Sequence, residues 1–277
     1  MSDPKKTALF ILYILVTGIV LIYVLFPSSA VKDHITNRIN RNTTDLRVDI
    51  GDLRLVFPPA ILLREVTIEN NKNGLFFIDR LKLSPRWRSM MLARNALNFR
   101  AEAYRGEISG YLSTVTNKEG TQISATGTFS QMQVENIPVV SAQLGDHLTG
   151  ILSGNFQLDT ISPQPATGNG TVYISDGNLI SPVSYLNLDR LNFQRIEAEF
   201  SFDGNYLEIL NAELQGPEMT GSASGTIFLE SPISGSRMDI EIELTPLLSS
   251  SLSGINTLTI RAGETFGNPK MTIVQAR

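Results

Sequence analysis

The chain has 277 residues, with 23 lysines and arginines against 27 aspartates and glutamates, and no cysteine. The absence of cysteine excludes a disulfide framework and any thiolate site for a metal or a redox reaction. Removing the two lysines and one aspartate of residues 1–31 leaves 21 basic and 26 acidic residues. This acidic remainder argues against a general nucleic-acid binder, which carries a basic surplus.

Residues 7–26 are almost wholly apolar, and no charged residue lies between Thr7 and Val31. A run of this length is about what a helix needs to cross a hydrocarbon core of roughly 30 Å. A cleaved signal peptide is the alternative, with Ser28-Ser29-Ala30 as its cleavage site, but the apolar core of a signal is only about 7–15 residues long. We therefore expect an uncleaved transmembrane helix.

The orientation of this helix follows from its flanks and from the domain behind it. Lys5 and Lys6 precede the run and favour a cytoplasmic N-terminus, although Lys32, Arg38 and Arg41 follow it closely. Long domains cross a membrane largely regardless of charge. We expect residues 1–6 in the cytoplasm and the rest of the chain beyond the helix outside it.

A short helix is predicted over residues 30–41, because Val31, Ile35 and Ile39 recur at helical spacing. From Arg47 the period changes to two, as in the alternation over residues 238–244. Strands are predicted at 47–51, 52–57, 61–69, 75–83, 98–103, 107–115, 121–129, 154–159, 170–175, 195–202, 206–214, 225–230, 238–244, 257–261 and 270–274. They could form one continuous sheet or two packed units.

Turns and a second short helix are expected between these strands. Asp176-Gly177-Asn178 and Asp203-Gly204-Asn205 have the composition of hairpin turns. Ser84-Pro85 resembles an N-cap followed by proline at the first helical position, which predicts a helix to about residue 94.

Three segments that begin at Gly154, Gly170 and Gly225 share a pattern of glycine, polar, apolar, any residue, Leu or Ile, and polar. The glycines could mark a repeated β unit, or they could simply mark turns and bulges of an antiparallel sheet. The distance between the segments is not fixed, so the sequence leaves both interpretations open.

No motif for catalysis or metal binding is present. His34 and His147, the two histidines, lie far apart in the chain, and neither belongs to a zinc-binding pattern. Glu197 and Glu199 would share one face of a strand, where a solvated surface is the simplest explanation. The sequence thus predicts no catalytic residue, no cofactor and no metal.

Residues 79–105 form a basic segment with a net charge of +5. Trp87, the only tryptophan, stands between Arg86 and Arg88, a combination that suits a membrane interface or anionic lipid head groups. The simpler interpretation is a solvated surface whose arginines pair with acidic neighbours.

Taken together, several motifs resemble the type II secretion system protein N family. They are the Phe26-Pro27 end of the apolar run and segments 57–66, 80–83, 103–110, 148–154, 168–179, 207–214, 221–229 and 267–270. That family in turn resembles the AsmA-like proteins of the Gram-negative envelope. The resemblance covers nearly the whole chain and rests on structural glycines and alternations.

The resemblance implies a mainly β fold, in which a transmembrane helix precedes an elongated, curved, taco-shaped antiparallel sheet with a few short helices. The expected segments are a cytoplasmic tail (1–6), a transmembrane helix (7–26), a juxtamembrane helix and linker (27–45) and a periplasmic β-rich domain (46–277). The expected location is the bacterial inner membrane, crossed once.

The resemblance further implies a non-enzymatic accessory component of a type II secretion system, which acts through contacts with other secretion-system or envelope proteins. The alternative is a lipid-handling protein whose apolar strand face holds the acyl chains of phospholipid. Arg86, Trp87 and Arg88 are the candidate head-group contacts. The candidate apolar groove consists of Phe156, Leu158, Val172, Ile174, Ile227, Leu229, Ile240 and Ile242.

Overall fold

The computed structural model describes residues 4–42, 46–70, 74–86, 89, 95–117, 120–138, 140–141, 148–161, 164–180, 190–230, 233–247 and 257–276. Two helices, α1 (Pro4–Val24) and α2 (Ser28–Asn42), precede fourteen strands. The strands are β1 (Leu46–Val56), β2 (Ala60–Asn70), β3 (Gly74–Pro85), β4 (Asn95–Ala103), β5 (Gly106–Asn117), β6 (Gly120–Gln133), β7 (Leu148–Ile161), β8 (Thr167–Ile180), β9 (Arg190–Asp203), β10 (Tyr206–Gln215), β11 (Met219–Phe228), β12 (Arg237–Pro246), β13 (Leu258–Thr265) and β14 (Asn268–Ala276). Among the described residues, the 3-10 helices η1 (Val134–Asn136) and η4 (Ile233–Gly235) lie between strands, and Ser89, Pro138, Val140 and Ser141 are also helical.

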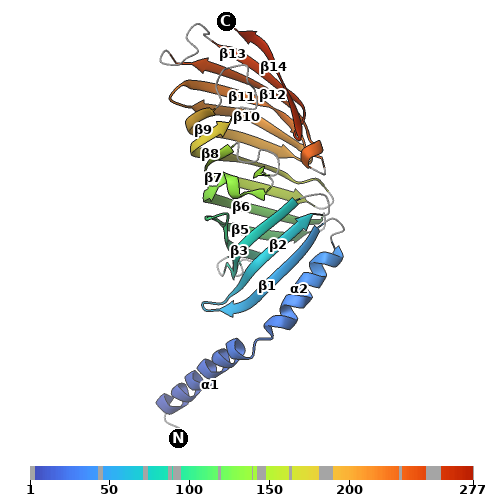
Figure 1. The fold of residues 1–277 in the computed structure, drawn as a ribbon. Coiled ribbons are helices and arrows are strands. Elements are labelled where there is room, and N and C mark those ends of the chain that lie inside the picture. The colour runs from blue at the N-terminus through green and yellow to red at the C-terminus, as the bar shows by residue number, and fades with distance from the viewer. Residues whose placement is uncertain are drawn as a thin grey trace.

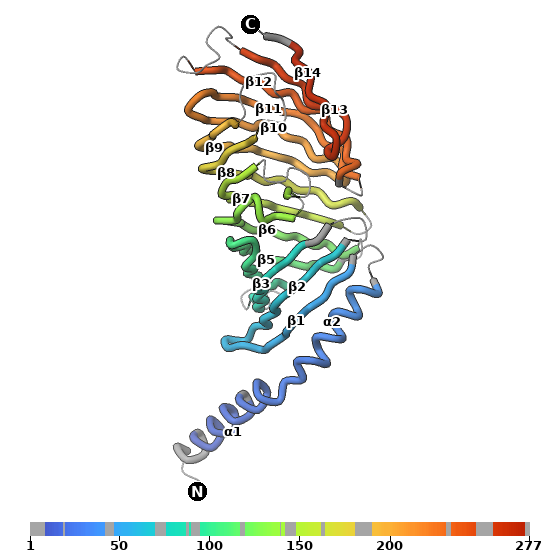
Figure 2. Tube along the Cα trace, in the orientation of Figure 1, coloured from blue at the N-terminus to red at the C-terminus, as the bar shows by residue number. Residues whose placement is uncertain are grey.

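All fourteen strands form one antiparallel sheet in which the spatial order equals the chain order. The strands stack along the long axis of the molecule, with the helices beside β1 at one end and the C-terminus beside β14 at the other (Figure 1). The tube in Figure 2 shows the chain passing from one end to the other in successive hairpins. The sheet is open, with β1 and β14 as its two edges, and it is one continuous sheet rather than two packed units.

The mainly β prediction is confirmed, and every predicted strand lies at an observed one. The predicted strands 47–51 and 52–57 are a single strand, β1, which continues through Gly51. The observed strands mostly extend beyond the alternating core that predicted them, as β7 does by starting at Leu148. The turn at Asp203-Gly204-Asn205 is confirmed, since Gly204 has a φ of 61° between β9 and β10.

Two local predictions are wrong. Ser84 and Pro85 do not open a helix, because they belong to β3 and face Asn98 and Leu97 of β4. The sheet continues past Pro85 with a 3.0 Å hydrogen bond from Arg86 N–H to the carbonyl of Ala96. Only the predicted start is therefore wrong, because Ser89 is helical and its N–H donates a 2.9 Å hydrogen bond to the carbonyl of Arg86. Residues 87–88 and 90–94 of the predicted helix lie outside the described residues.

The second wrong prediction is the hairpin turn at Asp176-Gly177-Asn178, which lies inside β8. Asp176 has a φ of 51°, and a register shift separates Thr149 and Ile151 on the neighbouring β7. The turn-type residues therefore serve a bulge rather than a reversal, and a bulge bends and twists its strand locally.

The apolar run at the N-terminus forms α1, whose exposed apolar side chains between Leu9 and Val24 are 49% to 73% accessible. No single described helix is both long and apolar enough to cross a membrane. The segments 9–24 and 28–41 meet that requirement only as a pair, with a 58° bend between them.

The predicted helix over residues 30–41 is confirmed as α2, which packs along β1. Phe26, Val31 and Ile35 lie against a buried cluster in the first two strands. The cluster consists of Val48, Ile50, Leu53, Leu63 and Val66.

Candidate functional site: an uncovered apolar face

One face of the sheet carries unbroken rows of apolar residues that run from strand to strand. The pairing register links one residue of each of the fourteen strands into a first row that contains no polar side chain. The row is Leu55, Ile61, Leu83, Phe99, Gly110, Gly127, Phe156, Gly170, Phe200, Ile209, Gly225, Ile240, Ala262 and Met271.

A second row lies beside the first and is equally free of polar side chains. It consists of Leu53, Leu63, Leu81, Ala101, Ile108, Phe129, Gly154, Val172, Ala198, Ala212, Ala223, Ile242, Ile260 and Ile273. In every strand but β10 the two rows are two residues apart, and residues two apart on a strand point to the same side. In β10 a register shift separates Ile209 and Ala212, which keeps both in line with their neighbours, so both rows line one face.

Two shorter rows flank this pair. One crosses β3 to β12, and the other crosses β6 to β13. They consist of Pro85, Leu97, Leu112, Ala125, Leu158, Gly168, Phe202, Leu207, Ile227 and Met238, and of Met132, Leu152, Ile174, Ile196, Leu214, Gly221, Leu244 and Leu258. We call the four rows together the apolar face.

At the β1–β2 end, α2 covers the apolar face, and Leu53 and Leu63 are buried there against Phe26, Val31 and Ile35. Over the other strands, no second sheet and no helix layer covers this face within the described parts of the chain. Apart from minor contacts, each strand contacts only its neighbours in the sheet. The other contacts between secondary-structure elements are those of α2 with β1 and of η1 with β7. Many side chains of this face are consequently only half-buried, and Leu158 is 39% exposed. A contiguous exposed apolar surface of this kind is typical of an interaction site.

Phenylalanine rings of this face lie over glycines of the adjacent strand. A Cβ atom added to Gly110, Gly127, Gly154 or Gly170 would lie 2.6–2.8 Å from Cζ of a cross-strand ring. The rings belong to Phe99, Phe156, Phe129 and Phe200, respectively. The glycines thus make room for neighbouring rings, which is a structural reason for two of the three glycine-led segments noted in the sequence.

The opposite face is polar and solvated. Arg261 donates two hydrogen bonds to Asp239, Nε to Oδ1 at 2.7 Å and Nη2 to Oδ2 at 2.6 Å. These bonds lower the pKa of the Asp239 carboxyl. On β9, Glu197 accepts a 2.7 Å hydrogen bond from Arg195, and Glu199 is exposed.

The eight residues of the predicted groove lie on or beside the apolar face. Phe156 and Ile240 belong to the first row, and Val172 and Ile242 to the second; Leu158, Ile227 and Ile174 occupy the flanking rows. Leu229 follows β11, where its N–H donates a 2.7 Å hydrogen bond to the carbonyl of Asn205. The prediction missed the contributions of β1 to β6, β9, β10, β13 and β14, which become visible only when the strands are placed in register.

Of the predicted head-group residues, only Arg86 lies within the described residues. Its guanidinium lies 4.6 Å from the ring centroid of Tyr111, whereas Trp87 and Arg88 are outside the described residues. Two further arginines of the basic segment pair with acids on the sheet, namely Arg80 with Glu102 at 3.5 Å and Arg100 with Glu107 at 3.0 Å.

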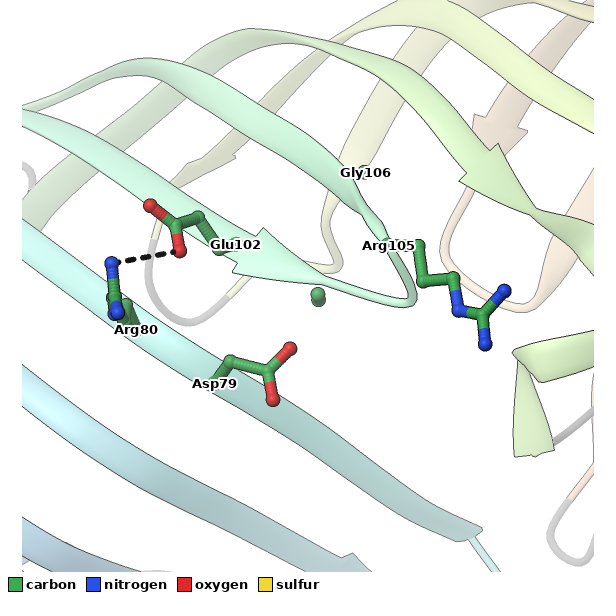
Figure 3. A pocket seen from close by; sticks show the side chains of 6 residues that line it. Asp79, Arg80, Glu102, Arg105 and Gly106 are labelled. Atoms are coloured by element: carbon green, nitrogen blue, oxygen red, sulfur yellow. Dashed lines mark ion pairs between the residues drawn. The ribbon is translucent and has the colours of Figure 1, made fainter.

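A polar hollow of about 470 Å³ lies at the turn between β4 and β5. Arg80 and Glu102 form an ion pair there, while Asp79 and Arg105 stand apart from it (Figure 3). Two acidic and two basic side chains line the hollow, so their charges cancel. Nearby, burial raises the pKa of Tyr104, whose Oη accepts a 3.1 Å hydrogen bond from Phe77 N–H.

The described residues form no cluster of metal ligands. His34 is exposed on α2, and His147 lies outside those residues. No group of three or more histidines, aspartates and glutamates in the described ranges is arranged to hold a metal ion.

Comparison of the chain with protein-family models, with curated proteins and with solved structures finds no match.

Proposed function

We propose that this protein is a membrane-anchored envelope protein that holds the acyl chains of phospholipids against the apolar face. The observation that carries the proposal is the pair of fourteen-residue rows without a polar side chain. Beyond the β1–β2 end, which α2 covers, no layer lies over these rows among the described residues. Such a surface offers no side-chain hydrogen bonds, so the ligand it suits is a hydrocarbon chain rather than a polar molecule.

The dimensions of the sheet agree with this ligand. Fourteen strands spaced about 4.8 Å apart give each long row a length of roughly 60 Å. This is about twice the hydrocarbon thickness of a bilayer, roughly 30 Å, so the apolar face has room for several acyl chains. Each buried methylene of a chain contributes about 0.8 kcal/mol, which makes even partial coverage favourable.

The tether in this proposal is the apolar run of residues 7–26, most of which lies in α1. It crosses the bacterial inner membrane with residues 1–6 in the cytoplasm and the sheet in the periplasm. Its exposed apolar side chains from Leu9 to Val24 support this role, because they need an apolar environment that the sheet does not supply.

Lipid binding is tested by purifying the full chain in a mild detergent and measuring co-purified phospholipid by native mass spectrometry. The unmodified protein is expected to retain phospholipid. Leu158→Asp and Ile242→Asp place a charge on the apolar face and should reduce the bound lipid several-fold. Leu158 is already 39% exposed, which limits the cost of that change to folding.

Thr128→Asp is the matched control, since Thr128 lies on the polar face between Ser109 and Asn155 of the neighbouring strands. It adds the same charge and should leave bound lipid unchanged. Circular dichroism verifies that all variants are folded. Equal amounts of lipid in the folded apolar-face variants and the unmodified protein would refute the proposal.

We further propose, as a second candidate, an accessory role in a type II secretion system through protein–protein contacts. The observation that favours it is the edge strand β14, where Ile273 is 45% and Val274 is 63% exposed. An open edge strand is a template for pairing with a strand of another protein.

Deletion of the gene should reduce export of the system's exoproteins if this second role holds. Val274→Lys puts a charge on the open edge and should reproduce the export defect without loss of bound phospholipid. Unchanged export after deletion would exclude a required role in secretion.

A further inference from the structure

The hairpin between β1 and β2 ends in a tip of Val56, Phe57, Pro58 and Pro59, which we call the hairpin tip. It contains no charged residue. Phe57 is 78% exposed, the highest value among the exposed large apolar side chains of the described residues. A single exposed apolar side chain is common on protein surfaces, so the exposure of Phe57 becomes informative only together with its neighbours.

Side-chain contacts join the hairpin tip to the end of α1. Tyr23, the second-last residue of α1, donates a 3.2 Å hydrogen bond from its hydroxyl to the carbonyl of Val56. The rings of Tyr23 and Phe57 lie 6.4 Å apart between centroids and are tilted by 60°. The tip therefore lies at the level where the apolar helix ends.

The path of the chain explains this placement. Near its C-terminal end, α2 contacts the start of β1, where the side chain of Asn40 bonds to Val48. Near its N-terminal end, Lys32 reaches the carbonyl of Gly51 at 3.4 Å. Thus β1 runs back along α2 towards α1, and its hairpin with β2 ends beside the junction of the two helices (Figure 1).

We propose that the hairpin tip inserts Phe57 into the interfacial layer of the same membrane leaflet from which α1 emerges. The partner is a lipid surface, and the inference rests on the proposed membrane anchor. Aromatic residues are favoured at this depth of a membrane, and Tyr23 supplies a second aromatic ring beside Phe57. The hairpin thereby becomes a second contact that fixes the orientation of the sheet relative to the membrane.

This contact also connects the bilayer to the apolar face. The first row starts with Leu55 and Ile61, which pair directly behind the hairpin tip. With the tip in the interfacial layer, acyl chains of the leaflet lie next to the first strands of the row.

The inference is tested with depth-dependent fluorescence quenching on the full chain. Trp87→Phe removes the only tryptophan, and Phe57→Trp then reports on the hairpin tip. The protein is reconstituted into phosphatidylcholine vesicles with or without brominated acyl chains. Bromine should quench Trp at position 57 at least twofold more strongly than Trp at an exposed position of the sheet.

Two matched variants decide how each result is interpreted. Leu15→Trp reports on the middle of α1, and Tyr206→Trp replaces a 59% exposed aromatic residue far from the tip. Quenching at positions 15 and 57 but not at 206 is the expected result. Quenching at 15 without quenching at 57 overturns the inference while leaving the anchor in place, and no quenching at 15 overturns the anchor and the inference with it.

Discussion

At the scale of single residues, glycine on the apolar face has a packing role. Gly127 pairs with Phe156 across β6 and β7, and a Cβ atom there would lie 2.8 Å from Cζ of that ring. The lack of a side chain at Gly127 leaves room for the ring of Phe156 on the next strand to approach the backbone. The rings therefore extend the apolar face over positions that would otherwise expose peptide groups.

The added methyl group of Gly127→Ala should destabilise the protein by about 1–3 kcal/mol, the usual cost of overpacking a tight site. Besides the ring, the new Cβ would lie 2.9 Å from the backbone carbonyl oxygen of Ser109, which cannot move freely. Gly263→Ala is the control, because its Cβ would lie 3.9 Å from the nearest atom, the carbonyl oxygen of Met238. Denaturant unfolding monitored by circular dichroism measures both, and equal stabilities of the two variants would contradict the packing role.

On the polar face, Asp159 offers a test by pH. Its carboxylate accepts hydrogen bonds from Ser124 Oγ at 2.5 Å and from Gln157 Nε2 at 3.1 Å, and these bonds lower its pKa. Because the pKa is lower in the folded than in the unfolded chain, the interaction stabilises the fold above about pH 4. That stabilisation is lost as the pH falls through the folded pKa.

Replacing Ser124 by alanine should raise the pKa of Asp159 towards its ordinary value, as measured by carboxyl-carbon NMR of labelled aspartate. The variant should be less stable than the unmodified protein at neutral pH, and this difference should vanish in acid. Ser113→Ala is the control, because Ser113 of β5 lies opposite Ser124 and its hydroxyl makes no hydrogen bond to Asp159. This change should leave the pKa of Asp159 unchanged.

At the scale of elements, strand existence could be predicted from the sequence, whereas strand ends and internal bulges could not. The alternation over residues 238–244 needs only the period of two, and β12 contains it. By contrast, Asp176-Gly177-Asn178 has the composition of a turn, but cross-strand pairing with β9 keeps the segment inside β8. Ser84-Pro85 likewise joins β3 because β4 is there to pair with it.

The residues of the apolar face, too, could be predicted within single strands but not across strands. Alternation within one strand placed Val172 and Ile174, or Ile240 and Ile242, on a common face. The rows across strands depend on register, which is set by turns and bulges between strands rather than by any pattern within one. Thus eight residues were singled out, whereas Gly127 and Gly170, which complete the first row, were not. Gly170 was noted only as the start of a glycine-led segment, and Gly127 lay unremarked inside the predicted strand 121–129.

The two edge strands of the sheet differ in whether another element bonds to their backbone. On β1, the side-chain amide of Asn40 donates to the carbonyl of Val48 at 3.0 Å and accepts from its N–H at 2.7 Å, as a further strand would. On β14, no described element takes that place. The open edge is therefore at the end far from the helices, where a partner strand could pair.

Asn40→Ala should release both hydrogen bonds to Val48 and lower the free energy of unfolding by about 1–2 kcal/mol, at about 1 kcal/mol per bond less the better helix propensity of alanine. The amide of Val48 should then exchange faster with deuterium. Asn37→Ala is the control, since this position of α2 gains the same helix propensity and the exposed side chain of Asn37 makes no hydrogen bond to the described residues. Equal exchange at Val48 in the two variants would show that Asn40 does not protect the edge.

At the scale of the whole molecule, the open meander is a linear array. Extensive contacts between strands occur only between neighbours in the sheet. The strands β1 and β14 are therefore connected only through the strands that lie between them. Architectures of this kind have stabilities that are close to a sum of local and nearest-neighbour contributions. A long sheet that stays open along one face can therefore unfold at one end while the other end remains formed.

This architecture predicts that a destabilising change remains local. Leu53 in β1 and Leu258 in β13 are both buried and lie at opposite ends of the sheet. Truncation of either to alanine should cost about 2–5 kcal/mol locally because it leaves a cavity. Hydrogen–deuterium exchange resolved by peptide should show faster exchange in β1 to β3 for Leu53→Ala and in β12 to β14 for Leu258→Ala, with the central strands β6 to β9 unchanged in both. Each variant is thus the control for the other. Faster exchange over all strands in either variant would mean that the sheet unfolds as one cooperative unit. The description of the sheet as a linear array of locally stabilised strands would then be wrong.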